Sequence, residues 1–135
     1  MRISSFDDFL TQARQQSDPQ RLLFVFTKTE RPDDATPAQL AAYQEGTGGA
    51  LTPMASLDKA LADVESFTAL SDEARQHVPD WKIVFVAALA GRDGATLTSK
   101  DAEKALDRMI EMIKMGSVGT LIPFDTSGHA VLLNA

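Results

Sequence analysis

The polar segment Gly91-Arg92-Asp93-Gly94 directly follows the apolar segment 81–90, which has the composition of a buried strand. Open α/β sheets usually bind ligands where such strands end, and an arginine is well suited to hold an anion. We therefore predict Arg92 as an anion contact, with Asp93 and Asp125 as polar groups that orient the ligand. No Gly-Lys-Ser/Thr follows, so the segment is not a Walker phosphate loop. A plain polar turn is the favoured alternative for Gly91–Gly94.

Two further motifs resemble functional sequences without matching their spacing. Glycines at positions 46, 48 and 49 would need another glycine at position 51 to form a dinucleotide-binding motif, and that residue is Leu51. The run Asp125-Thr126-Ser127-Gly128 is similar to the catalytic turn of aspartic proteases, but it carries one inserted residue. Those proteases also have a nearly all-β fold, whereas several helices are expected here. A hairpin turn is the favoured interpretation of residues 125–128.

Metal-binding and nucleophilic patterns are weak throughout the chain. His77 and His129 each lack a second histidine or cysteine three or four residues away. The acidic pair Asp33 and Asp34 lies beside prolines and is interpreted as a solvated turn. The sequence contains no cysteine and no G-x-S-x-G motif, so it offers no thiolate ligand and no serine nucleophile of that type. We therefore assign no catalytic residue, no metal and no cofactor, and the sequence favours a non-catalytic role.

Helices and strands alternate in the pattern of apolar residues. The spacing predicts helices over 6–16, 36–45, 58–77 and 98–115, and strands over 21–30, 50–57, 81–90, 119–124 and 130–133. Pro53 restricts the strand at 50–57 to the edge of a sheet. We expect a single α/β domain, with α+β as the alternative. Its central mixed sheet has four to five strands, covered by about four helices, and it ends in a C-terminal hairpin.

The overall composition is that of a soluble globular protein. The chain has 135 residues, of which 44% are hydrophobic, and a formal net charge of −6. This negative charge disfavours binding to nucleic acid or to anionic lipid surfaces. The polar residues at positions 1–8 do not form an apolar leader, and the lack of cysteine fits the cytoplasm. We expect a cytoplasmic protein with no nucleic-acid or membrane partner.

Four segments together are similar to one known family. They are 20–26 (QRLLFVF), 33–37 (DDATP), 81–89 (WKIVFVAAL) and 122–125 (IPFD). They resemble small proteobacterial proteins that often carry the label "ribonucleotide reductase subunit alpha", and the resemblance extends over nearly the whole chain. That enzyme is large and uses cysteine chemistry, whereas this chain is short and has no cysteine. The resemblance therefore implies a bacterial family but no reductase activity, and it brings no catalytic residues.

Two functions remain open from the sequence. The first is a small non-catalytic protein-association module that forms a homodimer. It is favoured by the expected edge strand at Ala50–Leu57, the terminal strand at Ala130–Leu133 and the methionines at positions 109, 112 and 115. The alternative is a protein or enzyme that binds a small anionic ligand at Gly91–Gly94.

Overall fold

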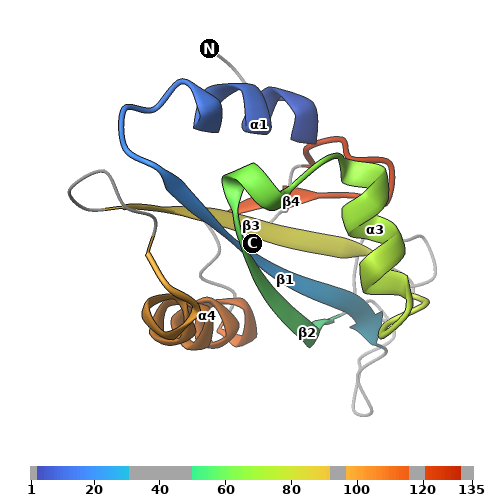
Figure 1. Cartoon of the computed structure of the whole chain (residues 1–135). Helices are drawn as coiled ribbons and strands as arrows, with labels where there is room; N and C mark the ends of the chain where they lie inside the picture. The colour runs from blue at the N-terminus through green and yellow to red at the C-terminus, as the bar shows by residue number, and fades with distance from the viewer. Residues whose placement is uncertain (1–2, 31–49, 92–96, 116–120, 132–135) are drawn as a thin grey trace.

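The computed structural model describes residues 3–30, 50–91, 97–115 and 121–131. Its elements are α1 (Phe6–Arg14), β1 (Gln20–Glu30), β2 (Ala50–Ala60), the 3-10 turn η1 (Leu61–Asp63), α3 (Phe67–Arg75), β3 (Ile83–Ala90), α4 (Ser99–Lys114) and β4 (Ile122–Phe124). The four strands form one open sheet in the order β2-β1-β3-β4. Helices α1 and α3 cover one face of the sheet, and α4 covers the other (Figure 1).

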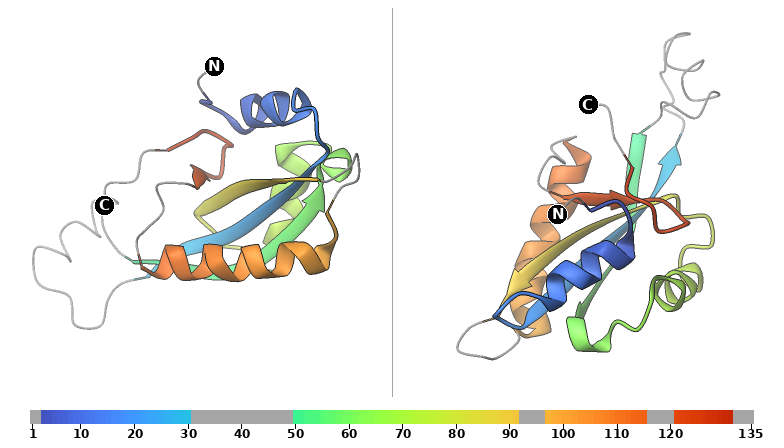
Figure 2. Two further views of the ribbon diagram at one scale, coloured as in Figure 1. Left: turned by 90° about the vertical axis from the view of Figure 1, so that its left-hand side faces the viewer. Right: turned by 90° about the horizontal axis from the view of Figure 1, so that it is seen from above.

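Strand β1 lies at the centre and is buried on both faces. Its side chains alternate between two apolar clusters, as the pleat of a strand requires. Leu22, Phe24 and Phe26 pack with α1 and α3, whereas Leu23 and Val25 pack with α4. All five are at most 1% exposed. The strand predicted over 21–30 is confirmed, and Figure 2 shows α1 and α4 on opposite sides of the sheet.

The prediction of a mixed sheet is wrong for the described strands, because all three strand pairs are antiparallel. The reason lies in the strand order. Strands β2 and β3, which are joined through α3, do run parallel to each other, since each is antiparallel to β1. However, β1 lies between them, so no parallel ladder forms. The described chain is therefore α+β, which was the alternative to the α/β expectation.

The predicted helix over 58–77 is also wrong in its first half. Strand β2 continues to Ala60, and Asp58 lies opposite Leu23 in the ladder with β1. Helix α3 begins only at Phe67, where the Ser66 hydroxyl accepts a hydrogen bond from the Ala69 N–H at 3.1 Å. This cap fixes the start of the helix, and the apolar residues before it follow the strand and η1 instead. The helix predicted at 36–45 lies outside the described residues.

In place of the predicted C-terminal hairpin, residues 130–131 make a few backbone contacts with β4. The second strand, predicted at Ala130–Leu133, is present as an isolated antiparallel bridge between Phe124 and Ala130, and residues 132–133 lie outside the described part. The Val131 N–H also donates to the Pro123 carbonyl at 3.1 Å. A fifth strand is thus not confirmed, but these contacts occupy the outer side of β4.

Helix α1 begins at a hydrogen-bonded cap that involves a carboxylate. The Ser5 hydroxyl accepts from the Asp8 N–H at 3.2 Å, and the Ser4 hydroxyl donates to Asp8 Oδ2 at 2.7 Å. The Ser4 N–H donates to the same oxygen at 3.1 Å. The hydrogen bonds from Ser4, first through its side chain, lower the pKa of Asp8 from its ordinary value. The ionised carboxylate is therefore the form that favours the fold.

We expect Asp8→Asn to lower the melting temperature at neutral pH and to have a smaller effect at about pH 3. Because the pKa of Asp8 is lower in the folded state, its ionisation stabilises the protein above the unfolded-state pKa of about 4. This stabilisation is lost as the pH falls through the folded-state pKa. Thermal unfolding followed by circular dichroism at both pH values measures the difference. The exposed Asp7, which makes no such contact with Ser4, provides the control as Asp7→Asn. Equal losses for Asp8→Asn at both pH values would contradict the assignment.

Candidate protein-interaction edge

Of the three residues predicted for a ligand site, Asp125 alone lies within the described part of the chain. Arg92 and Asp93 lie outside the described residues. Asp125 follows β4, which pairs with the first residues of β3, whereas Gly91 follows the last residue of β3. Residues 83–91 of an extended strand span about 26 Å. Asp125 therefore lies at the end of β3 opposite to Gly91.

Asp125 has a structural role in the turn that follows β4. Its Oδ1 accepts hydrogen bonds from the Ser127 N–H at 2.8 Å and the His129 N–H at 3.1 Å. Gly128 has φ of +82° in this turn, and its carbonyl accepts from the Phe6 N–H at 2.7 Å. The interpretation of residues 125–128 as a turn is confirmed. Within the described ranges, no three groups among histidine, aspartate and glutamate lie together as a metal site would require.

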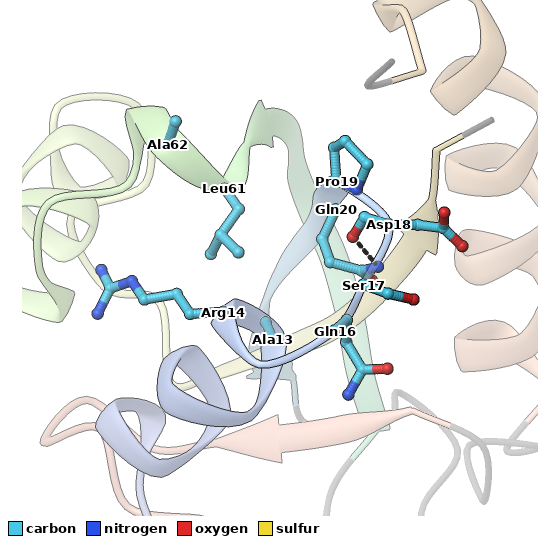
Figure 3. Close-up of a pocket in the computed structure, with 9 residues that line it drawn as sticks. All are labelled: Ala13, Arg14, Gln16, Ser17, Asp18, Pro19, Gln20, Leu61 and Ala62. Carbon is cyan, nitrogen blue, oxygen red and sulfur yellow. Dashed lines mark hydrogen bonds between the residues drawn. The ribbon is translucent and has the colours of Figure 1, made fainter. Parts of the chain in front are cut away.

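A first hollow of about 460 Å³ lies between the end of α1, the start of β1 and η1 (Figure 3). The Gln20 amide turns back to donate to the Asp18 carbonyl at 3.0 Å, so it is not directed at a ligand. Figure 3 shows the charged ends of Arg14 and Asp18 pointing in opposite directions. Catalytic and ligand sites need polar groups that converge on one point. This hollow does not have that arrangement.

A second hollow, of about 540 Å³, lies between β2 and the first half of α4. It is lined by Ser56, Asp58, Ser99, Lys100, Glu103, Leu106 and Asp107. The two strand residues lie on the face of the sheet that α4 covers, since Ser99 contacts Asp58 directly. The hollow is therefore a groove with one wall from a strand and one from a helix. We call it the β2–α4 groove.

A polar cluster closes the end of this groove at the start of α4. The Arg21 Nε–H donates to Asp58 Oδ2 at 2.7 Å, and the Ser99 hydroxyl donates to the same oxygen at 2.8 Å. A second guanidinium nitrogen of Arg21 contacts the same carboxylate, and Arg21 also donates to the Leu97 carbonyl at 3.3 Å. These contacts join β1, β2 and the start of α4. Because Arg21 and Asp58 are committed to each other, the cluster is a structural connection rather than a free anion site.

Strand β2 is the open edge of the sheet, since its only strand partner among the described residues is β1. The orientation of its backbone follows from β1. The carbonyls of Pro19 and Thr27 accept hydrogen bonds on the β3 side, so the odd-numbered residues of β1 face β3 and the even-numbered ones face β2. The even-numbered residues lie opposite Ala55, Leu57 and Lys59. The N–H and C=O groups of Ser56 and Asp58 therefore point away from β1, toward the open side.

The open edge is short because it is interrupted near Pro53. The ladder with β1 shifts register between Phe26 and Thr27, which leaves Met54 as an extra residue in β2. The bulge changes the face of the side chains that precede it. Leu51 packs with the α4 cluster, whereas Ala55 and Leu57 pack with the opposite cluster. Pro53 lies opposite Thr27 and so faces the open side without an N–H to donate.

The sequence predicted the edge strand at 50–57 but not the groove beside it. The edge position that Pro53 indicated is confirmed in the described sheet. The sequence predicts a helix at Asp58 and assigns no role to Glu103 or Asp107. The spacing of Glu103 and Asp107 does indicate that they share one flank of the predicted helix, because residues four apart share a helix face. What the sequence could not supply was the strand that faces this flank.

We expect Asp58→Ala to lower the free energy of unfolding by about 2 kcal/mol, because it leaves the largely buried Arg21 guanidinium without its counter-charge. The side chains of this pair are 14% and 18% exposed. The Lys59–Glu73 pair is the matched control, since its side chains are 26% and 40% exposed. Glu73→Ala should cost less than about 1 kcal/mol. Urea denaturation measures both, and equal costs would contradict the structural role of Asp58.

Comparison with known proteins gives no indication of function, so the functional argument depends on the fold and on the β2–α4 groove. No protein family, no curated protein and no solved structure matches this chain. The resemblance to the family labelled as a reductase subunit therefore stays a prediction. Among the described helices, none has the length and apolar character needed to cross a membrane.

Proposed function

We propose that this chain is a small non-catalytic protein-association module that binds an extended segment of another protein along β2. The observation that carries the proposal is the open edge of β2, where the backbone groups of Ser56 and Asp58 face away from β1. An extended segment adds to such an edge through main-chain hydrogen bonds. The adjacent groove leaves room for its side chains on the α4 side.

The rest of the described surface supports association more than catalysis. In the β2–α4 groove the Ser99 hydroxyl donates to Asp58, but this carboxylate is paired with Arg21 and is therefore a poor general base. The other edge of the sheet, β4, is contacted by Ala130 and Val131. Strand β2 is thus the edge at which a further strand can be added. The homodimer expected from the sequence would use the same edge, and it remains a prediction.

We expect Ser56→Pro to weaken strand addition at least tenfold, because proline removes the outward N–H of residue 56 and its ring blocks the approach of a strand. The probe is an octapeptide of alternating lysine and threonine, and its Kd is measured by NMR titration of the labelled protein. Ser56→Ala keeps the N–H and should bind within twofold of the wild type. Circular dichroism checks that both variants are folded.

Native mass spectrometry of the same proteins tests the homodimer in parallel. A dimer that persists in Ser56→Ala and dissociates in Ser56→Pro would identify a second copy as the strand donor. Strand addition at β2 is ruled out if the wild type neither dimerises nor binds this peptide or the same peptide with glutamate in place of lysine. It is also ruled out if Ser56→Pro and Ser56→Ala behave alike.

A further inference from the structure

We propose that the segment added to β2 is basic, with lysine or arginine at alternate positions that face α4. This inference rests on the proposed function and specifies its partner. The partner is a stretch of about five residues from another protein, held between the edge of β2 and the first half of α4.

The position of the added strand follows from the geometry of sheets. It would lie about 4.8 Å from β2, and its alternate side chains would point to the face that α4 covers. On that face, Ser56 and Asp58 line the same groove as Glu103 and Asp107. Alternate side chains of the added strand would therefore approach these two carboxylates of α4.

The charges in the groove leave a negative excess for these side chains to meet. Asp58 is already paired with Arg21. Glu103 and Asp107 lie four residues apart on one flank of α4, are both exposed, and have no ion pair within the part of the chain that the structure describes. Lys100 is the single basic residue in the lining. The net charge of −6 adds a longer-range attraction for a basic segment.

A second copy of this chain fits the groove less well than a basic segment. In a symmetric pairing of two β2 edges, the same surface of both copies meets at one axis. The Glu103 and Asp107 carboxylates of both copies would then lie near each other, and like charges brought together disfavour association. Both copies also carry the same net charge of −6. The charge pattern therefore favours a different protein as the donor.

The length of the segment is limited at both ends of the open edge. Pro53 and the Met54 bulge interrupt it on one side, and η1 begins at Leu61 on the other. Residues 55–60 remain, with outward backbone groups at Ser56 and Asp58. A matching segment pairs over about five residues, of which two or three direct side chains toward α4.

The experiment compares peptides and charge variants by NMR titration at low salt. The basic octapeptide is tested against the same peptide with glutamate in place of each lysine, which should bind at least tenfold more weakly. The double variant Glu103→Gln with Asp107→Asn should weaken binding of the basic peptide about fivefold. The control is Glu65→Gln with Asp72→Asn, which changes the net charge equally at two exposed positions away from the groove. It should change the affinity less than twofold.

A further probe separates strand addition from general electrostatic attraction. Two versions of the basic peptide are made, one methylated at the backbone nitrogens of its odd-numbered residues and the other at those of its even-numbered residues. One version loses the N–H groups that face β2, and the other loses those that face solvent. Only one version should lose binding, by at least tenfold, because only alternate N–H groups of a strand face its neighbour. Charge is identical in the two methylated peptides.

The outcomes distinguish this inference from the proposed function. If acidic and basic peptides bind equally and Ser56→Pro weakens both, the basic preference is wrong but strand addition stands. If charge matters while Ser56→Pro and methylation have no effect, both proposals are overturned, because the peptide then binds only by surface attraction. A homodimer through β2 that excludes every peptide would overturn the basic segment and identify a second copy as the occupant.

Discussion

The burial of β1 on both faces is the constraint on which the rest of this structure depends. Each of its five buried apolar side chains contributes about 2 kcal/mol when it leaves water. These side chains are buried only if helices pack on both faces of the sheet. Helices α1 and α3 pack on one face and α4 packs on the other. The helices also determine what stays exposed, since they enclose the faces of the sheet and leave its β2 edge unpaired by another described strand. The candidate interface is thus a consequence of how the core is closed.

Local patterns in the sequence predicted the elements better than their arrangement. The helices predicted over 6–16 and 98–115 and the strand predicted over 21–30 depend on residues a few positions apart, and α1, α4 and β1 lie within two residues of these bounds. The sheet topology depends on which strands meet. The insertion of β1 between β2 and β3 turns what looks like a parallel unit into an antiparallel sheet, and no local pattern carries that information. The helix predicted from Asp58 failed because Ser66, the actual cap, was not recognised as one.

The same distinction holds for the candidate site. Pro53 predicted an edge strand, since its missing N–H cannot serve a central ladder. The groove beside that edge requires two segments separated by more than 40 residues, Ser56 and Asp58 on the strand and residues 99–107 on the helix. The type of Asp125 predicts a ligand-orienting group, and in the structure its Oδ1 accepts hydrogen bonds from backbone N–H groups of its own turn. Residue type alone does not show that a carboxylate oxygen is already engaged in this way.

The bulge at Met54 and the proline beside it have a consequence for the behaviour of this chain at high concentration. An open strand of 11 residues would be a template for unlimited edge-to-edge stacking and fibril growth. The bulge twists the strand, and Pro53 removes a donor at a position that faces outward. Only a few residues of regular backbone then remain to be paired. The bulge and the proline therefore oppose long, regular edge-to-edge pairing of this strand.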